Sequence, residues 1–326
     1  MNDIKAVASI IKKHKRFLVS AHINPEGDSI GSQVALASLL RRLGKEVVIV
    51  NASPLPRNLE FMPGAKGIYK EMPNNFKFEV ALILDCPSLD RVGDISRYIK
   101  EDKIVVNIDH HISNKYFGKY NWVETKISSV GEMIFKLFEA FKEKLTYDEA
   151  VAIYVAIMTD TGSFRYTNTS ATTHRFISQL IDRGVKPYDI YSKIYETTTL
   201  EDIKLLAGSL ETLKLSPDGQ IAWLWITKEM LKKTKGTLEG TEGIINFARS
   251  IENVKIAAFF RETGTENKIK ISFRSKGGAD VNKLASFFEG GGHASASGCT
   301  VYGSKEEVEK KVLLKAKEML LSEKTN

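Results

Sequence analysis

The stretch Val105-Val106-Asn107-Ile108-Asp109-His110-His111 is an apolar strand that runs directly into one acidic residue and two imidazoles. Two other apolar runs end in a similar way, one in His22-Ile23-Asn24-Pro25-Glu26-Gly27-Asp28 and the other in Asp85. Carboxylate and imidazole groups are common ligands of divalent metal ions. Several strands that end in residues of this type indicate a metal-dependent active site.

The first half of the chain alternates short apolar runs with helical patterns. Buried strands are expected over residues 17–21, 47–50, 80–84 and 104–108. Helices are expected over residues 29–43, 95–99, 130–141, 147–158 and 173–182. This alternation predicts an α/β fold with a parallel, doubly wound sheet. Because ligands bind at the carboxyl ends of the strands in such sheets, we expect His22, Asp85 and Asp109 to meet there.

The pattern changes after the turn signal Ser216-Pro217-Asp218-Gly219. Strands over 221–226, 256–261 and 269–274, with helices near 243–250 and 281–288, predict a second, smaller α/β domain. The preceding residues have a helical pattern typical of a connector. We therefore expect a catalytic, metal-binding domain over 1–187, a helical linker over 188–213 and a substrate-binding domain over 214–326.

The composition is that of a soluble globular protein. The chain has 326 residues, of which 43% are hydrophobic and 27% charged. No apolar run approaches the ~20 residues needed to cross a bilayer, and the N-terminal residues lack the apolar core of a signal peptide. Two cysteines, Cys86 and Cys299, provide no disulfide framework. These features predict a cytoplasmic protein without a membrane partner.

The net charge of +7 does not discriminate between functions. A basic surface attracts phosphate-rich ligands, but lysines scattered over solvated helices would give the same excess.

Each acidic motif also has a purely structural interpretation. Asp28 could cap the helix that follows it, Asp85 could cap the next turn, and Asp160 could be a turn residue before Gly162. The run Asp109-His110-His111 is harder to explain in this way, because adjacent histidines at the end of a buried strand rarely serve packing alone.

Taken together, the motifs provide a set of imidazole and carboxylate ligands. The candidate metal ligands are His22, Glu26, Asp28, Asp85, His110 and Asp160. Such a mixture suits Mn²⁺, Mg²⁺, Fe²⁺ or Co²⁺ better than a thiolate-based zinc site does. Two ions ~3.5–4 Å apart could share one carboxylate and bridge a hydroxide, and would neutralise charge on a phosphoryl group.

A second candidate site is the glycine run over residues 290–298, GGGHASASG. Three successive glycines let backbone N–H groups approach a phosphate closely. The alternative is a flexible loop after the predicted helix. The embedded histidine and hydroxyl residues favour binding. The candidate substrate-binding residues are Arg274, Gly291, Gly292, His293, Ser295 and Ser297.

These residues resemble the motifs of the DHH phosphoesterase family. The family has a His-x-x-Pro-Asp-x-Asp opening, an isolated Asp at a strand end, Asp-His-His and a further Asp. Here these motifs stand at residues 22–28, Asp85, residues 109–111 and Asp160. One departure is Glu26, which stands where the family usually has Asp. Its longer side chain can still bind a metal, with a changed metal spacing or preference.

The resemblance implies a role for each of these residues. One metal would be held by His22, Glu26 and Asp85, and the other by Asp28, Asp85, His110 and Asp160, with Asp85 bridging. The resemblance assigns Asp109 and His111 to the catalytic group, with Asp109 supporting His110 and His111 facing the scissile phosphate. Arg274 and His293 would bind a substrate phosphate, because the glycine run resembles the DHH-associated domain that grips the nucleic-acid end of the substrate.

The two-domain length is similar to that of the NrnA-like branch of this family, which degrades very short oligoribonucleotides and dephosphorylates pAp. The resemblance therefore implies a two-metal hydrolase, both an exonuclease and a phosphomonoesterase. It would convert short oligonucleotides (nanoRNA) and pAp to mononucleotides by attack of a metal-bridging hydroxide. The expected cofactor is a pair of divalent ions. Mn²⁺ is the preferred metal, and Mg²⁺ and Co²⁺ are the alternatives.

Two other functions stay open at this point. One is a phosphodiesterase acting on linear or cyclic dinucleotides, and the other is a nucleotide-binding regulator without catalysis. The converging set of metal ligands argues against the regulator. In every case the expected partner is short single-stranded RNA or DNA or a nucleotide, and a homodimer is compatible with the sequence.

Overall fold

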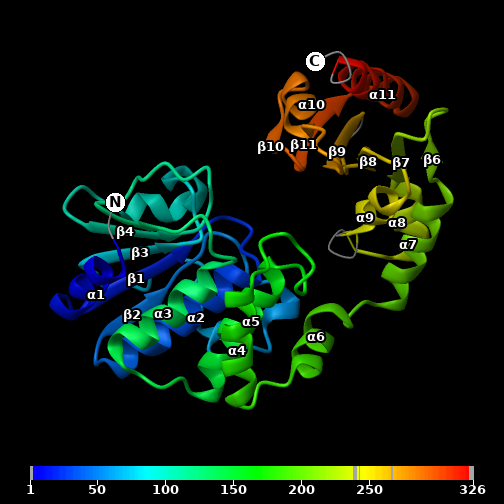
Figure 1. Ribbon diagram of the computed structural model, residues 1–326. Coiled ribbons are helices and arrows are strands. Elements are labelled where there is room, and N and C mark those ends of the chain that lie inside the picture. Colours follow the sequence, from blue (N-terminus) through cyan, green and yellow to red (C-terminus); the bar gives the residue numbers. More distant parts are fainter. Residues whose placement is uncertain (1–2, 238–240, 242, 266, 323–326) are drawn as a thin grey trace. The chain divides into compact units, whose positions relative to one another are not determined.

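The computed structural model describes residues 3–237, 241, 243–265 and 267–322 (Figure 1). The chain divides into two compact units, Met1–Thr197 and Thr198–Asn326. Among the described residues, no helix is both long enough and apolar enough to cross a membrane.

The first unit is built on a sheet in which all the described strands pair in parallel, in the order β2–β1–β3–β4–β5. The strands are β1 (Arg16–Ala21), β2 (Glu46–Ile49), β3 (Val80–Leu84), β4 (Ile104–Asp109) and β5 (Tyr120–Val123). The expected α/β fold with a parallel sheet is thereby confirmed. The sequence analysis does not predict β5.

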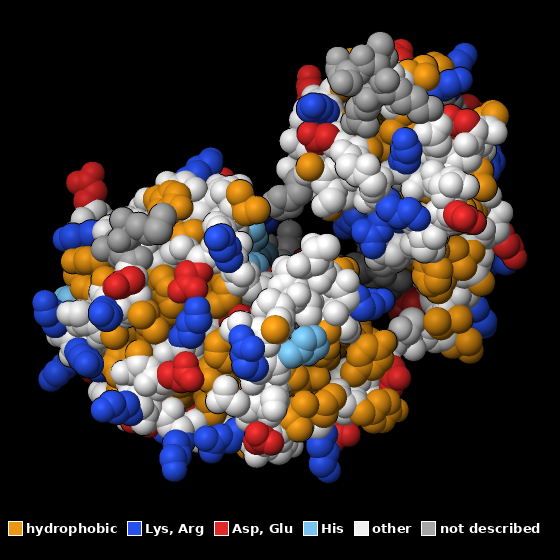
Figure 2. Space-filling view, in the orientation of Figure 1, with side chains coloured by type: hydrophobic (Ala, Val, Ile, Leu, Met, Phe, Trp, Pro, Cys, Tyr) orange, Lys and Arg blue, Asp and Glu red, His pale blue; other side chains and the backbone are white. Residues whose placement is uncertain are grey.

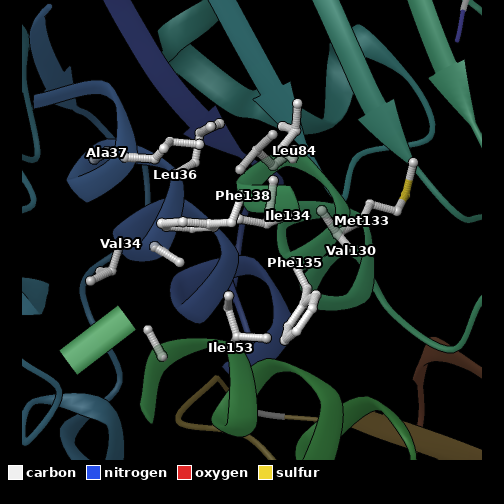
Figure 3. Close-up of a cluster of buried hydrophobic side chains, with 14 of the residues drawn as sticks. Val34, Leu36, Ala37, Leu84, Val130, Met133, Ile134, Phe135, Phe138 and Ile153 are labelled. Atoms are coloured by element: carbon white, nitrogen blue, oxygen red, sulfur yellow. The ribbon is translucent and has the colours of Figure 1, made fainter. Parts of the chain in front are cut away.

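Helices pack against this sheet through alternating strand residues. Phe17, Val19 and Leu82 belong to the larger core, whereas the intervening Leu18 and Ala81 belong to a second core on the other face. The helices are α1 (Ile4–Lys13), α2 (Gly27–Arg42), α3 (Val130–Phe141), α4 (Tyr147–Asp160), α5 (Ala171–Asp182) and α6 (Pro187–Tyr195). Figure 3 shows the larger core, to which α2, α3 and α4 contribute Val34, Ile134 and Ile153. The two cores explain why β3 reads as a continuous apolar run.

At the second core, the 3₁₀ segment η3 takes the place of the α-helix expected over residues 95–99. The 3₁₀ segments of this unit are η1 (Arg57–Leu59), η2 (Ala65–Gly67) and η3 (Leu89–Tyr98). Gly93 interrupts η3 with a φ of +63°, a conformation that glycine adopts without steric cost. Ile95 and Ile99 do pack in this core, but they belong to a kinked 3₁₀ segment and its C-cap.

Two glycines let α2 lie directly against α4. A Cβ atom on Gly31 would overlap the carbonyl oxygen of Ala152, and one on Gly27 would overlap the side chain of Thr159. The first residues of α2 therefore lie beside the last residues of α4. This packing brings Asp28 and Asp160 to the same end of the unit.

The second unit contains a mixed sheet in the order β10–β11–β9–β8–β7–β6 over the described residues. Its strands are β6 (Lys214–Leu215), β7 (Ile221–Ile226), β8 (Ile256–Glu262), β9 (Lys268–Ser275), β10 (Gly291–His293) and β11 (Ala296–Tyr302). Among its described strands, only β7 and β8 pair in parallel. The helices are α7 (Leu200–Glu211), α8 (Lys228–Thr234), α9 (Ile244–Ser250), α10 (Val281–Phe287) and α11 (Lys305–Ser322). This is the second α/β domain predicted by the strand and helix patterns.

The stretch expected to form one helical linker contains two separate helices. Ile190 and Ile194 of α6 are buried in the larger core of the first unit. Leu205 of α7 is buried in a core of the second unit, and the Thr199 side chain caps the start of α7. The chain therefore passes from one unit to the other between these helices.

Candidate metal centre

The register of the parallel sheet aligns the ends of three strands. Ala21 of β1 pairs with Leu84 of β3, and Leu84 pairs with Ile108 of β4. His22 and Asp85 directly follow the first two strands, and Asp109 is the last residue of the third. These residues therefore lie at the same edge of the sheet, as the strand pattern predicts.

Asp85 lies at the middle of this edge and is only 5% exposed. Its Oδ2 accepts a hydrogen bond from Ser29 Oγ at 2.5 Å and lies 3.4 Å from His22 Nε2. Burial opposes the charged form of Asp85, but His110 and His22 outweigh that effect and hold the pKa of this carboxyl well below its usual range. Its φ of +51° is rare for a residue other than glycine, and such backbone strain is common at functional sites.

Asp28 lies in the first turn of α2, but its side chain caps a different helix, α3. Its carboxylate accepts hydrogen bonds from the backbone N–H groups of Val130 at 2.7 Å and Gly131 at 2.9 Å, at the start of α3. Ser32 Oγ donates a third hydrogen bond at 3.0 Å. Burial nevertheless raises the pKa of Asp28 well above its ordinary value, and the charges of Asp85 and Asp160 add to the shift.

His110 lies among three carboxylates. Its Nε2 is 3.6 Å from Asp85 Oδ1, 3.7 Å from Asp160 Oδ2 and 3.9 Å from Asp28 Oδ2. Burial alone would lower the pKa of His110, but the neighbouring carboxylates raise it to about 10. Burial raises the pKa of Asp160 to about 6, against the opposing effect of His110. Such mutual perturbation arises when several charged groups share a small buried volume.

Two groups of side chains in this cluster can each hold a metal ion. One group is Asp85, His110 and His111, and the other is Asp28, His110 and Asp160, with the ligand atoms of each group within 4.8 Å of one another. Oxygen and imidazole donors of this kind suit Mn²⁺, Mg²⁺ or Co²⁺. Burial, together with the charge of neighbouring carboxylates, raises the pKa of Asp28 and Asp160, and a divalent cation would offset both effects. The donor set therefore fits a divalent metal.

His22 lies beside Ser29 and Asp85, whereas Glu26 is exposed. His22 Nε2 is 3.0 Å from Ser29 Oγ, and its Nδ1 is 2.7 Å from the carbonyl oxygen of Ile23. Glu26 is the exposed N-cap residue of α2, without a side-chain capping bond. It belongs to neither of the two metal-binding groups found among the described residues, although its charge contributes to the raised pKa of Asp160.

Asp109 contacts His111, whereas the sequence analysis assigns it to the support of His110. Its Oδ1 lies 2.7 Å from His111 Nδ1, and the side chain of Asp109 is fully buried. His111 Nδ1 is also 3.6 Å from Asp85 Oδ1. The difference arises because Asp109 and His111 turn toward each other after the strand ends, which the order of residues along the chain does not reveal.

Three other polar residues hold the metal centre together, and the sequence analysis does not select them. Ser29 bridges His22 and Asp85. Asn168 Nδ2 donates to the carbonyl oxygen of Asp160 at 3.1 Å, and Asn114 Nδ2 donates to Asp109 Oδ2 at 2.5 Å. A local signal exists only for Ser29, a small hydroxyl residue in the first turn after the motif. The two asparagines lie in connections without any distinctive pattern.

In the second unit, the glycine run forms a β-hairpin, so the alternative of a flexible loop is wrong. Gly291 of β10 pairs with Gly298 of β11, and His293 pairs with Ala296. A Cβ atom on Gly290 would overlap the carbonyl oxygen of Gly298. Gly292 has a φ of +149°, and a Cβ atom on it would overlap the backbone of Ala296 and Ser297. The close approach of the two strands therefore explains why these positions are glycines.

The other predicted substrate-binding residues lie within this hairpin or beside it. Arg274 of β9 pairs with Ala296, so its backbone lies beside β11, and its Nη1 donates to the carbonyl oxygen of Phe273 at 3.0 Å. Ser295 is exposed at the hairpin turn. Ser297 is buried, and its hydroxyl donates to the carbonyl oxygen of Val281 at 2.6 Å, which commits it to the fold. The side chain of His293 lies outside the described part of the structure.

Comparisons with known proteins agree with this geometry. Residues 16–157 match the model of the DHH family N-terminal domain, and residues 226–322 match that of the DHHA1 domain. The chain is 31% identical, over 90% of its length and 91% of the relative, to the bifunctional oligoribonuclease and PAP phosphatase NrnA of Bacillus subtilis. The protein of the same name in Thermus thermophilus is 28% identical over 92% of the chain and 89% of the relative.

Solved structures show the same architecture. An exopolyphosphatase-related protein from Bacteroides fragilis is 30% identical and superposes with a TM-score of 0.89, over 98% of this chain and 95% of that one. RecJ of Thermus thermophilus, solved in complex with Mn²⁺, is 12% identical with a TM-score of 0.55, over 96% of this chain and 53% of RecJ. At that identity the likeness to RecJ concerns the fold alone.

Proposed function

Because the chain belongs to the DHH family, we propose that it is a metal-dependent phosphoesterase that hydrolyses short oligonucleotides and pAp to mononucleotides. The observation that carries this proposal is the convergence of His110 with the carboxylates of Asp28, Asp85 and Asp160 at the carboxyl edge of the sheet. The names of its relatives from Bacillus subtilis and Thermus thermophilus support the choice of substrate.

We assign two divalent ions to this centre, with Mn²⁺ as the preferred metal. The proposed ligands are His22, Glu26 and Asp85 for one ion, and Asp28, Asp85, His110 and Asp160 for the other. When bound, such ions polarise a phosphoryl group and lower the pKa of water.

The protein's own contribution to this chemistry is a rigid frame. Asp28 is held by two backbone N–H groups of α3, and Asp85 by the Ser29 hydroxyl. His111 is half-buried and is oriented by Asp109, so we assign it the contact with the scissile phosphate. Donors fixed before the substrate binds stabilise developing charge without a reorganisation cost during the reaction.

The second unit would bind the far end of a short substrate. We assign this role to Arg274, His293, Ser295 and the backbone of Gly291 and Gly292. The Ser297 hydroxyl is engaged with Val281, so this residue would contribute through its backbone. A second unit that binds one end of the oligonucleotide would favour substrates only a few nucleotides long.

The test is a substrate panel with metal-stripped protein. Trimeric RNA, trimeric DNA, pAp and linear and cyclic dinucleotides would each be incubated with Mn²⁺, Mg²⁺ or Co²⁺, and the products separated by chromatography. We expect hydrolysis of trimeric RNA and of pAp with Mn²⁺. The proposal is wrong if both substrates stay intact with every metal.

Two variants make this test specific to the centre. Asp85→Asn removes a charged ligand while keeping its shape, and should lower kcat by more than about 100-fold, since loss even of a residue that only supports a ligand costs 10–100-fold. Asp102→Asn is the matched control, because Asp102 is an exposed residue whose carboxylate binds Lys103. The control should keep wild-type activity.

A further inference from the structure

Asn114 lies in the turn that follows the Asp109-His110-His111 motif, and it is buried. Its backbone N–H donates to the carbonyl oxygen of His111 at 3.2 Å. Its side-chain Oδ1 accepts a hydrogen bond from the backbone N–H of Tyr116 at 2.7 Å. The turn therefore holds this side chain beside Asp109 at the metal centre.

The amide group of Asn114 connects two fully buried side chains. Its Nδ2 donates to Asp109 Oδ2 at 2.5 Å and to Asn107 Oδ1 at 2.8 Å. A buried carboxylate is costly unless it is hydrogen-bonded. One oxygen of Asp109 is thus held by Asn114, and the other faces His111 Nδ1 at 2.7 Å.

The orientation of the Asn114 amide is determined from both sides. Asn107 Nδ2 donates to the backbone carbonyls of Cys86 at 3.1 Å and Ile83 at 3.3 Å, so Asn107 must turn its oxygen toward Asn114. On the other side, the Tyr116 N–H requires an oxygen. Asn114 can satisfy both neighbours only with its NH₂ group toward Asp109.

This arrangement also determines which ring nitrogen of His111 acts as a hydrogen-bond donor to Asp109. A carboxylate has no proton to donate, so His111 Nδ1 must carry the proton of the bond to Asp109. The hydrogen bond that one nitrogen makes determines what the other can do.

We propose that Asn114 is a positioning residue, which fixes the ring orientation of His111 through Asp109. This inference rests on the proposed function, in which His111 contacts the scissile phosphate. Asn114 would act on the rate of turnover and not on metal binding, because the described hydrogen bonds of its side chain run to Asp109, Asn107, Cys86 and Tyr116 and not to the proposed metal ligands.

The variant Asn114→Asp tests this role with almost no change of shape. It places an oxygen where the NH₂ group faced Asp109, so the two carboxylates repel each other. Asp109 then moves and no longer orients the ring of His111. We expect kcat to fall roughly 10–100-fold, while KM and the Mn²⁺ concentration for half-maximal activity change by less than about 2-fold. Asn58→Asp is the matched control, since Asn58 Nδ2 donates to the carbonyl oxygen of Ile194, away from the metal centre.

A double-mutant cycle separates positioning from a structural role of the turn. If Asn114 acts through His111, adding Asn114→Asp to His111→Ala causes no further fall in kcat. An equal fold-change in both backgrounds would overturn the proposal, as would wild-type kcat in the single variant.

A second measurement does not depend on activity. NMR should show a hydrogen-bonded Nδ1–H signal of His111 in the wild-type protein, assigned by its absence from His111→Ala. The signal should disappear in Asn114→Asp and persist in Asn58→Asp. Its persistence in Asn114→Asp would contradict the proposed role. A wild-type protein that shows the signal but cleaves no substrate would refute the proposed function and leave this geometry intact.

Discussion

His110 is the residue at which the charges of the metal centre converge. Its Nε2 lies 3.6–3.9 Å from oxygens of three carboxylates. These carboxylates raise the pKa of His110 to about 10, so the imidazole is protonated at pH 8 in the metal-free protein. The raised pKa of His110 stabilises the folded state. This stabilisation is complete below pH 6.5, where the imidazole is charged in both the folded and the unfolded chain. It is lost as the pH rises through about 10.

Metal binding at pH 8 should therefore release protons. A histidine must be neutral to bind a metal, so His110 has to lose its proton when Mn²⁺ enters. Calorimetric titrations in two buffers with different ionisation enthalpies should show the release of about one proton from this residue. The variant His110→Ala should release correspondingly fewer. Equal heats in both buffers for the wild-type protein would show that His110 is not protonated beforehand.

At the scale of the elements, apolar periodicity predicts the central strands and helices well. The expected strand over 80–84 coincides with β3, and the expected helix over 130–141 coincides with α3. The elements that periodicity does not predict depend on contacts with other elements of the same chain. The sequence of β10 consists of two glycines and a histidine, which have little strand preference of their own, and it becomes a strand by pairing with β11.

The close contact of α2 with α4 depends on Gly31. In Gly31→Ala, the new Cβ atom would overlap the backbone carbonyl of Ala152 and force the helices apart. We expect a loss of about 1–3 kcal/mol in the free energy of unfolding, measured by urea denaturation, and weaker Mn²⁺ binding as Asp28 and Asp160 separate.

Gly208→Ala provides the control for this prediction. Gly208 lies inside α7, with no atom near the position of a Cβ. Because alanine is the better helix former, this substitution should stabilise the protein by about 0.5–1 kcal/mol. If Gly31→Ala stabilised the protein to the same degree, the helix contact would be looser than described.

At the scale of the whole molecule, each unit has its own core. The largest cluster of buried residues lies in the first unit, and two separate clusters lie in the second. On the face drawn in Figure 2, basic and acidic side chains of the first unit are interspersed, which agrees with scattered lysines as the source of much of the net charge. A cytoplasmic location and a homodimer stay predictions.

Bound metal should stabilise the first unit, because it joins the ends of β1, β3, β4, α2 and α4. A ligand that binds only the folded state adds about 2.7 kcal/mol to stability at 100 times its Kd. Saturating Mn²⁺ should therefore raise the midpoint of thermal unfolding, and EDTA should reverse the shift. In Asp85→Asn the same addition of Mn²⁺ should cause little shift. A midpoint of the wild-type protein that does not respond to Mn²⁺ would argue against a metal centre.

By itself, the sequence determines the parallel α/β fold, the family and the types of the candidate ligands. It can do so because apolar periodicity and short motifs are local properties of the chain. The tertiary structure decides which side chains meet. Asp28 caps a helix that begins 102 residues further along the chain, and Asp109 supports His111 with the help of Asn114. These pairings follow from strand register and helix packing, and no local pattern of residues encodes them.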